Sequence, residues 1–516
     1  MSSSSVESVR ELLNKPWKTV PFPNIKSSDL FSLFLKVGLA ISTIFLISHL
    51  FYLSLNYHQP QSHYDHLALK EMFHRSTPKT LIIDSGPAEQ PTAAAEEPTK
   101  IFHVLFGIGG SYATWNTRRF YSELWWRQNT TRGFVWLDRE PPINETWPET
   151  SLPYKVSADT SSFRYTCWYG SRSAIRIARI LKESFELGLD NVRWFVMGDD
   201  DTVFFTDNLL TVLSKYDHNQ MYYIGGNSES VEQDVVHFYT MAYGGGGFAI
   251  SYPLAAELVK ILDGCIDRYS EYYGSDQKIQ SCISEIGVQI TKEPGFHQVD
   301  IRGNPYGLLA AHPVAPLVSL HHLDYVDSIF PNMPRVDSVK KLITAYKSDP
   351  GRTIQKSYCY DHTRNWSVSV SWGYSVELYP FLPRAKEFEM ALQTFKTWRS
   401  WSDGPFTFNT RPVSGDPCEK PLVYFMERVD DVGKGLTRSG YKRYDAVSEK
   451  KCEREDYKPV LEIQYVNVSA PLLLPHYWKE APRRQCCEII NDADGVNNVV
   501  NVKIRGCQQF ESVTPR

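Results

Sequence analysis

The sequence lacks long basic runs, and its 55 Lys and Arg nearly balance 59 Asp and Glu, for a formal net charge of −4. Because a nucleic-acid-binding surface needs clustered cations, nucleic acid is not an expected partner. The nine cysteines include no C-x-x-C pair, so their spacing gives no indication of a zinc site. The glycine-rich segment 107–110 does not complete the G-x-G-x-x-G pattern, which argues against a dinucleotide cofactor.

Charged side chains are also missing from residues 37–55, an apolar run without Asp, Glu, Lys or Arg. A helix of this length spans about 28 Å, close to the hydrocarbon thickness of a bilayer. Basic residues precede the run, so the positive-inside rule predicts a cytosolic tail at 1–36 and a single-pass, type II anchor at 37–55. A cleaved signal peptide is the alternative, but the leader is long and no A-x-A-like site follows the run.

The chain beyond the anchor has the features of a secretory protein. Residues 56–98 are polar and rich in Pro, Ala and Glu, which predicts a flexible stem. All nine cysteines lie beyond the anchor, where disulfides can form, and their odd number leaves at least one unpaired. The pairing stays open. Four N-glycosylation sequons lie on the same predicted side, at Asn129, Asn144, Asn365 and Asn467.

At 516 residues the chain exceeds one core, so we expect two folded parts, 99–335 and 340–516. The first part alternates strand and helix patterns, at 101–107, 117–126, 133–138, 171–187 and 193–198. This β-α-β-α-β order predicts a nucleotide-binding α/β sheet. The second part has short, aromatic, turn-punctuated segments and most of the cysteines, which indicates a β-rich module.

Three consecutive carboxylates, Asp199, Asp200 and Asp201, lie between two apolar runs typical of buried strands. Like charges at a strand end repel one another and resist desolvation unless a cation joins them. The pattern therefore favours a divalent-metal site at the carboxyl edge of the sheet, where open α/β folds bind ligands. A solvated acidic loop is the alternative.

Three further elements follow the acidic triplet. The four glycines at 244–247 allow close approach by a ligand or another loop. Asp276 begins a helical stretch, where an N-cap role and a functional one are both open. An apolar strand ends in His321 and His322, and an Asp/Asp/His set suits a Mn²⁺-type ion.

The residues 194–201, the 244–251 segment and the Asp276 loop occur in the order found in Fringe-type glycosyltransferases. The chain resembles glycosyltransferase family 31, the β-1,3-glycosyltransferases. It is most similar to the plant-type, Fringe-related branch that carries a C-terminal domain of unknown function. Residues 106–112 and 320–324 are also typical of that branch.

The resemblance implies a GT-A (Rossmann-like, nucleotide-sugar-binding) domain, an N-terminal anchor in the Golgi membrane with the catalytic part in the lumen, a UDP-sugar donor and Mn²⁺. By position, Asp201 would be the chief metal ligand, joined by Asp199 and by His321 or His322. Asp199 and Asp200 would contact the donor, and Asp138 the uridine. Gly245 and Gly246 would line the cleft. Asp276 would be the general base, although relatives often carry two adjacent acids there.

The implied reaction is an inverting transfer from a UDP-sugar to a glycan or glycoprotein acceptor, with a β-1,3 linkage. A haloacid-dehalogenase-type phosphatase is an alternative, because Asp199-x-Asp201-x-Val203 nearly fits its nucleophile motif. That family places the motif on its first strand, whereas strand patterns precede it here. A catalytically inactive, Golgi-anchored glycan-binding or assembly protein is the other alternative. The donor sugar, the acceptor and the role of the C-terminal module, whether acceptor binding or homodimer formation, stay open.

Overall fold

The computed structural model describes residues 36, 38, 39, 41–48, 97–445, 452–490 and 498–513. The chain divides into two units, Met1–Ala94 and Ala95–Arg516. Within the predicted anchor, residues 38, 39 and 41–48 are helical, and the remaining positions of 37–55 lie outside the described residues. No helix in the described part of the chain is both long and apolar enough to cross a membrane. The predicted stem at 56–98 is described only at its last two positions.

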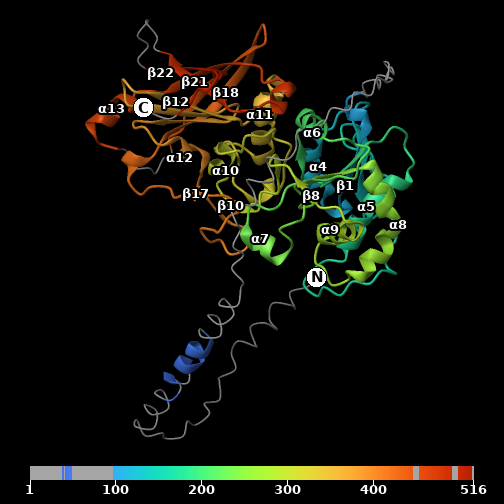
Figure 1. Cartoon of the computed structure of the whole chain (residues 1–516). Helices are drawn as coiled ribbons and strands as arrows, with labels where there is room; N and C mark the ends of the chain where they lie inside the picture. The colour runs from blue at the N-terminus through green and yellow to red at the C-terminus, as the bar shows by residue number, and fades with distance from the viewer. Residues whose placement is uncertain are drawn as a thin grey trace, which may run out of the picture. The chain divides into compact units, whose positions relative to one another are not determined.

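The larger unit begins with a seven-stranded sheet in the order β3-β2-β1-β4-β7-β6-β8 (Figure 1). Four neighbouring strands run parallel, namely β1 (Val104–Gly109), β2 (Arg132–Leu137), β3 (Tyr154–Val156) and β4 (Trp194–Asp199). The rest of the sheet is mixed and consists of β6 (Tyr223–Gly225), β7 (Phe248–Ser251) and β8 (Ile290–Lys292). The helices connected to it are α4 (Tyr112–Glu123), α5 (Ser173–Glu186), α8 (Tyr252–Arg268) and α9 (Ser275–Ile286). The predicted mixed α/β architecture is confirmed.

The strands form where the sequence is continuously apolar. All of β1 is buried, and β4 is buried up to Asp199, as expected for parallel strands covered on both faces. Helix α4 begins at Tyr112 rather than at the expected Thr117. Ser111 accepts a hydrogen bond from the backbone N–H of Ala113, and Asp138 accepts one from that of Tyr112, so the early turn is capped.

A small sheet adjoins the parallel strands and carries the ends of three distant segments. Its order is β5-β11-β9, with β5 at Val203–Phe204, β11 at Ser319–Leu320 and β9 at Phe296–His297. Short helices lie in the same part of the chain, namely α6 (Thr206–Leu213), α7 (Val231–Val236) and α10 (Tyr306–Ala310).

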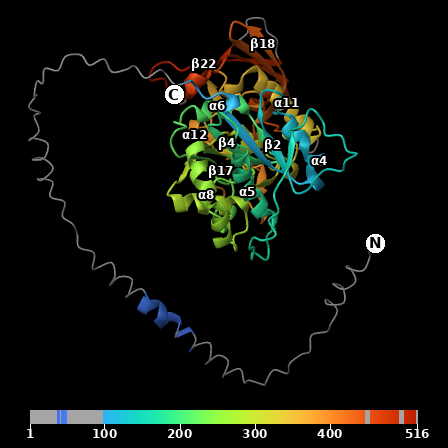
Figure 2. The same cartoon turned by 90° about the vertical axis from the view of Figure 1, so that its right-hand side faces the viewer.

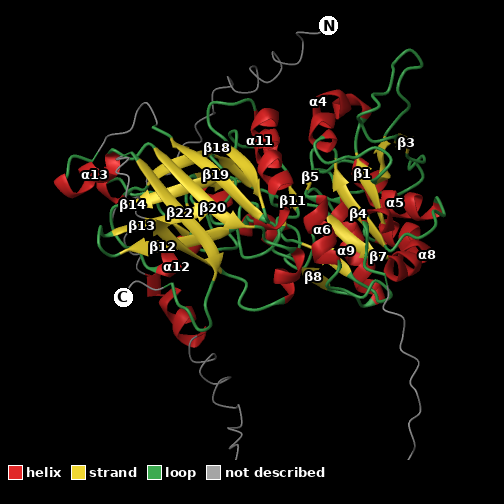
Figure 3. Ribbon diagram, turned by 90° about the horizontal axis from the view of Figure 1, so that it is seen from above, coloured by secondary structure: helices red, strands yellow, loops and turns green. Residues whose placement is uncertain are grey.

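The C-terminal part is an eight-stranded sheet in the order β12-β13-β14-β18-β19-β20-β22-β21, separate from the first sheet in Figure 3. In Figure 2 its strands β18 and β22 lie above β4 of the first sheet. Its strands are β12 (Lys356–Asp361), β13 (Trp366–Ser371), β14 (Ser375–Tyr379), β18 (Leu422–Gly433), β19 (Leu436–Arg443), β20 (Tyr465–Pro471), β21 (Gln485–Ile490) and β22 (Val499–Gly506). Helix α11 (Arg335–Ser348) contacts β18. The remaining short elements are α12 (Ala385–Glu389), α13 (Lys458–Leu461), β15 (Ala391–Leu392) and β17 (Thr410–Arg411).

Four disulfides stabilise the larger unit. One joins α8 to α9, and three lie in the C-terminal part, where Cys359–Cys487 joins β12 to β21; the pairs are Cys265–Cys282, Cys359–Cys487, Cys418–Cys452 and Cys486–Cys507. Among the described cysteines, Cys167 is left unpaired and buried. The expectation of disulfides with an odd cysteine is confirmed.

The two sheets belong to one compact unit, residues 95–516. Strand β10 (Ile301–Gly303) from the first part pairs antiparallel with β16 (Phe395–Thr397) from the second. One continuous hydrophobic cluster contains both Phe204 and Tyr374. The division near residues 335–340 therefore stays a prediction, and side chains from beyond residue 340 reach the functional site described next.

Candidate functional site

Two carboxylates and one imidazole meet where β4 ends. Nε2 of His321 lies 3.0 Å from Oδ1 of Asp201 and 3.8 Å from Oδ2 of Asp199. One ligand atom from each of these three residues lies within 4.8 Å of the others, an arrangement that could hold a metal ion. The structure thus brings His321 together with Asp199 and Asp201, which lie more than a hundred positions earlier in the sequence.

Strand register explains which of the two histidines joins the carboxylates. In the antiparallel pair of β5 and β11, Leu320 lies opposite Val203, so the residue after Leu320 continues toward the acidic turn. His321 follows there. His322 adopts a left-handed conformation with a φ of 52°, and its Nδ1 lies 2.9 Å from Oδ1 of Asp300 instead. The geometry groups His321, and not His322, with Asp199 and Asp201.

The donor set fits a divalent cation. Both carboxylate oxygens of Asp201 are buried, and their charged neighbours are Nε2 of His321, 3.0 Å from Oδ1, and Arg118, 3.4 Å from Oδ2. The buried Nδ1 of His321 makes no hydrogen bond with the described residues. Buried polar atoms are nearly always hydrogen-bonded, so this nitrogen and the close-packed carboxylates leave room for a further partner. Two oxygens and one imidazole nitrogen suit an ion such as Mn²⁺.

The electrostatics of the cluster show how strongly its charges interact. Loss of surrounding water raises the pKa of Asp199 to about 7, with the carboxylates of Asp201 and Asp200 adding to the effect. Burial opposes ionisation of Asp201 too, but the charges of His321 and Arg118 outweigh it and lower its pKa. Burial likewise disfavours protonated His321, yet Asp201 raises its pKa to about 9. An added positive charge here would stabilise the ionised carboxylates.

Asp200 points to the other side of the acidic turn. Its Oδ1 accepts a hydrogen bond from Arg118 of α4 at 3.1 Å, and its Oδ2 accepts one from Thr114 at 3.1 Å. The same Arg118 nitrogen lies 3.4 Å from Oδ2 of Asp201. Sequence reasoning missed Arg118, because only the fold brings α4 beside the turn. The contact of Asp200 with the sugar donor stays a prediction.

The glycine turn 244–247 closes against the histidine. A Cβ at Gly245 would lie 2.0 Å from Cε1 of His321, so a side chain at this position has no room. Thr202 donates its hydroxyl hydrogen to the carbonyl of Gly245, and the N–H of Gly246 donates to Gln298. The glycines were expected to allow close approach by a ligand or another loop, and in the structure His321 approaches Gly245 in this way. A role in lining the cleft stays a prediction.

Asp276 lies in the first turn of α9, opposite the acidic turn. Its Oδ2 accepts from the N–H of Gly244 and its Oδ1 from the N–H of Gln277, at 3.1 and 2.9 Å. Burial raises its pKa above the usual range, although these hydrogen bonds oppose the shift. A small cavity is lined by both Asp199 and Asp276, so the candidate base and a candidate metal ligand share one space.

Asp138, predicted to contact the nucleoside, follows β2 directly and lies at the same edge of the sheet. Its Oδ1 accepts the N–H of Tyr112, 2.8 Å away, at the start of α4. Desolvation opposes ionisation, but this and other hydrogen bonds lower its pKa. The structure thus gives Asp138 a helix-capping contact, and its contact with a ligand stays a prediction.

An exposed row of aromatic rings begins beside Asp276. His237 stacks on Tyr273 with ring centroids 5.3 Å apart, Tyr273 stacks on Tyr169 at 5.6 Å, and Tyr169 meets Trp168 at 5.3 Å. The indole of Trp168 is 91% exposed. His237 interacts electrostatically with Asp276, so the inner end of the row lies near the candidate base. Aromatic faces of this kind pack against the C–H faces of sugars.

The second half of the chain also contributes to the site. The rings of His322 and Trp398 are stacked, with centroids 4.2 Å apart and planes 7° from parallel. The guanidinium of Arg302 lies over the indole of Trp398, 3.8 Å from its centroid. Sequence reasoning missed Trp398 and Arg302, and no motif signalled them.

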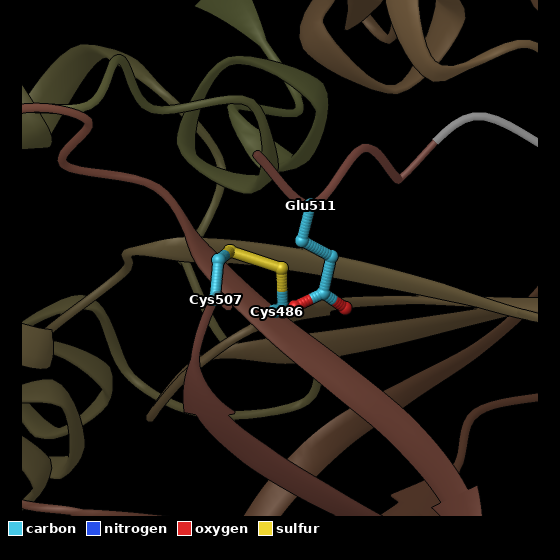
Figure 4. A group of neighbouring side chains, drawn as sticks. All are labelled: Cys486, Cys507 and Glu511. Atoms are coloured by element: carbon cyan, nitrogen blue, oxygen red, sulfur yellow. A yellow bond between two sulfur atoms is a disulfide. The ribbon is translucent and has the colours of Figure 1, made fainter. Parts of the chain in front are cut away.

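A second group of potential ligands, Cys486, Cys507 and Glu511, lies in the C-terminal sheet (Figure 4). The two sulfur atoms form a disulfide. A disulfide sulfur is not a thiolate, so this group does not offer the cysteine ligands of a metal site.

A family model described as "Protein of unknown function, DUF604" matches residues 233–487. The match includes Asp276, His321 and Trp398 and spans parts of both sheets, but it begins after the acidic turn. The family description assigns no activity.

The chain is also similar to glycosyltransferases. The human "Beta-1,3-glucosyltransferase" is 28% identical over 168 residues, which are 31% of this chain and 32% of that protein. The mouse protein of the same name is 27% identical over 206 residues, 37% of this chain and 39% of that protein. The chain thus matches only about a third of the length of these relatives.

Among solved structures, the catalytic domain of Drosophila beta1,4galactosyltransferase 7 in complex with xylobiose matches with a TM-score of 0.21 and 14% identity. The match covers 36% of this chain and 64% of that one. This level of likeness carries no argument about the chain.

Proposed function

We propose that the chain is a metal-dependent, inverting glycosyltransferase with a GT-A catalytic part that transfers a sugar from a UDP-sugar to a hydroxyl group of a glycan or glycoprotein. One observation carries the proposal: Asp199, Asp201 and His321 form a cluster that could hold a cation, and Asp199 lines the same cavity as Asp276. Similarity to β-1,3-glucosyltransferases supports the reaction class and a β-1,3 linkage.

In this proposal Asp199, Asp201 and His321 would hold Mn²⁺ or a similar ion. A divalent ion bound there would supply Lewis-acid neutralisation of the charge that develops on the diphosphate. Arg118 holds Asp200 and faces Asp201, so it fixes the acidic turn before the donor binds. A site fixed in advance loses less free energy to reorganisation during the reaction.

Asp276 supplies the base. The acceptor hydroxyl oxygen attacks the anomeric carbon, the bond from that carbon to the UDP oxygen breaks, and the hydroxyl proton passes to Asp276. Attack from the side opposite the leaving group inverts the configuration. The N–H groups of Gly244 and Gln277 hold the two oxygens of Asp276 in place, so its carboxylate cannot rotate away from the cavity.

We further infer that the catalytic part works in the lumen of the secretory pathway, in the Golgi, behind a type II membrane anchor at residues 37–55. Four disulfides support an oxidising compartment. The anchor itself is supported by the sequence alone.

The test is a UDP-sugar binding and hydrolysis panel on the full chain, with and without Mn²⁺. We expect one UDP-sugar to bind only with the metal, Asp201→Ala to abolish binding, and Asp276→Asn to retain binding but lose turnover. Asp190→Asn, which changes an exposed carboxylate outside the site, is the matched control. Absence of UDP-sugar binding in every condition would reject the proposal in favour of a catalytically inactive glycan-binding protein.

A further inference from the structure

A large cavity lies away from the acidic turn, where the two halves of the larger unit meet. Its volume is about 760 Å³, within the ~300–1,000 Å³ typical of small-molecule sites. The first half supplies residues 226–229, 292–294, 296, 297, 308 and 311–314, and the second half supplies residues 356, 358, 386, 389–391, 407–409 and 484. The cavity therefore exists only because the two halves are packed together.

Two buried histidines in its wall have unused hydrogen-bonding atoms. The side chains of His297 and His312 are more than nine-tenths buried, and their ring centroids are 5.0 Å apart. Within the described part of the chain, the Nε2 of His297 and both ring nitrogens of His312 lack a hydrogen bond of normal geometry, and the backbone of Pro313 is the nearest polar neighbour named for His312. Buried polar atoms without partners are rare in native proteins and call for a ligand or water.

The proton positions define what these rings offer. Nδ1 of His297 lies 3.2 Å from Oε1 of Glu229, and because a carboxylate only accepts, Nδ1 carries the proton. Burial, and then the neighbouring His297, lower the pKa of His312 well below its usual range, so its ring is neutral. A neutral imidazole has one donor and one acceptor. Because the Nδ1 proton of His297 faces Glu229, only its Nε2 is left for a ligand, whereas His312 has one donor and one acceptor. A hydroxyl group can bond to both rings.

The charged residues in the wall do not favour a charged ligand of either sign. The ammonium of Lys356 donates to the carbonyl of Phe388, Lys386 pairs with Glu389, and Arg484 donates to the carbonyl of Glu511. Four cations and three carboxylates line the cavity, so their charges nearly cancel; these are Lys292, Lys356, Lys386, Arg484, Glu229, Glu293 and Glu389.

The remaining wall mixes apolar and polar groups. Phe296, Leu308 and Phe408 present apolar surface, whereas Asn227 and Asn409 present amides. Sugar rings combine apolar C–H faces with hydroxyl edges that donate and accept. We propose that this cavity is a binding site for a short, neutral saccharide, distinct from the site of transfer, in which His297 and His312 hydrogen-bond its hydroxyl groups.

The site is joined to the metal-site histidines by a short chain of contacts. Glu229 holds His297 through one oxygen, and its other oxygen accepts the N–H of Asp300 at 3.2 Å. The carboxylate of Asp300 contacts His322, next to His321. Four residues, His297, Glu229, Asp300 and His322, therefore connect a saccharide in this cavity to the candidate metal ligand His321.

The test is isothermal titration of the full chain with cellobiose, xylobiose, lactose and inorganic phosphate, without Mn²⁺ and without nucleotide. Val314→Trp places a large side chain at the cavity wall, and Val413→Trp is its matched control because Val413 is similarly exposed but lies outside the lining residues. His312→Leu removes the hydrogen-bonding ring while keeping an apolar side chain. Thermal unfolding of every variant verifies that it is folded.

We expect at least one disaccharide to bind, with affinity about tenfold weaker in His312→Leu and lost in Val314→Trp. Binding to Val413→Trp should match the wild type. The proposal is overturned if no disaccharide binds, if only phosphate binds, or if Val314→Trp binds normally. Because the assay contains neither metal nor donor, its result does not depend on whether the proposed transfer occurs.

Discussion

The imidazole of His322 lies flat on the indole of Trp398, with ring centroids 4.2 Å apart. His322 belongs to the segment that follows β11, and Trp398 follows β16, which pairs with β10 across the two halves of the chain. The rings of His321 and His322 are 3.9 Å apart, so this stack lies directly behind the candidate metal ligand. The C-terminal half therefore supports the site as well as covering the first half.

Replacing Trp398 by Ala should reduce turnover more than it reduces stability. The change removes the stack on His322 and the indole under Arg302, so the histidine pair loses its rigid backing. Misplacement by about 1 Å can lower a rate about 10²-fold, whereas an aromatic pair contributes only about 0.5–1.5 kcal/mol to stability. Steady-state kinetics and thermal unfolding of the same variant measure the two effects.

Trp401→Ala is the matched control, because Trp401 is 61% exposed. We expect Trp401→Ala to retain the turnover number of the wild type. Equal losses of turnover in both variants would show that the effect is not specific to the His322 stack.

Local patterns in the sequence predicted which side chains meet at the acidic turn but not what surrounds them. Three carboxylates after an apolar strand, and two histidines after another, are local signals, and the structure brings Asp199, Asp201 and His321 together. The choice between His321 and His322 depends on the register of β5 and β11, which only the folded chain sets. Arg118 and Trp398 occur in ordinary sequence contexts. Their place in the site results from packing between distant segments.

The limits of element prediction have a similar cause. The strand before His321 has only two residues, Ser319–Leu320. In the apolar run before it, Leu317 and Val318 pack in the core, and Val318 bonds to Phe205 and Gly295 outside the strand ladder. The cavity between the two halves could not be predicted either. It depends on loops that no local pattern connects.

Introducing a methyl group at Gly245 should abolish metal binding. In Gly245→Ala the new Cβ would lie 2.0 Å from Cε1 of His321, so the imidazole has to move away from Asp201. We expect the affinity for Mn²⁺, measured by titration of the full chain, to fall at least as far as in His321→Ala. Gly415→Ala is the control, because a Cβ there meets nothing within 4 Å among the described residues. Unchanged Mn²⁺ affinity in Gly245→Ala would contradict the assignment of His321.

Stability should rise with pH above about 8 because of Lys356. Burial lowers the pKa of this ammonium from 10.5 to about 8, although the charge of Glu377 opposes the shift. The unfolded chain then binds the proton more tightly, so folding is penalised below pH 8 and the penalty disappears as the pH rises from 8 to 10.5. A shift of this size corresponds to about 3 kcal/mol. This rise in stability with pH should be absent in Lys356→Met.

The measurement is the difference in melting temperature between Lys356→Met and the wild type from pH 7 to pH 10. Other titrating groups are common to both proteins and cancel in this difference. We expect the difference to shift steadily in favour of the wild type as the pH rises. A difference that does not vary with pH would show that Lys356 is not desolvated as the structure indicates.

Removing the outermost ring of the aromatic row should weaken acceptor binding alone. Trp168 is 91% exposed at the end of the row that begins beside Asp276, so its indole can contact a sugar of the acceptor. Loss of one stacking face should raise the KM for the acceptor about fivefold. Hydrolysis of the donor in the absence of acceptor should not change. Phe510→Ala, which removes a ring that is 95% exposed elsewhere, is the control. An effect of Trp168→Ala on donor hydrolysis would place the row on the donor side.

The sequons provide a test of the proposed lumenal location. Asn129, Asn144 and Asn365 are exposed, so an oligosaccharide can be attached to each without displacing the fold. Asn467 is only partly exposed, and its amide donates a hydrogen bond to Asn501 at 3.2 Å within the C-terminal sheet. We therefore expect three occupied sites when the full chain is expressed in its secretory pathway. Each Asn→Gln change at an exposed sequon should remove one glycosidase-sensitive step in electrophoretic mobility, whereas Asn467→Gln should remove none. A chain that carries no glycan at any of the four positions would contradict the proposed type II topology, because only lumenal sequons are glycosylated.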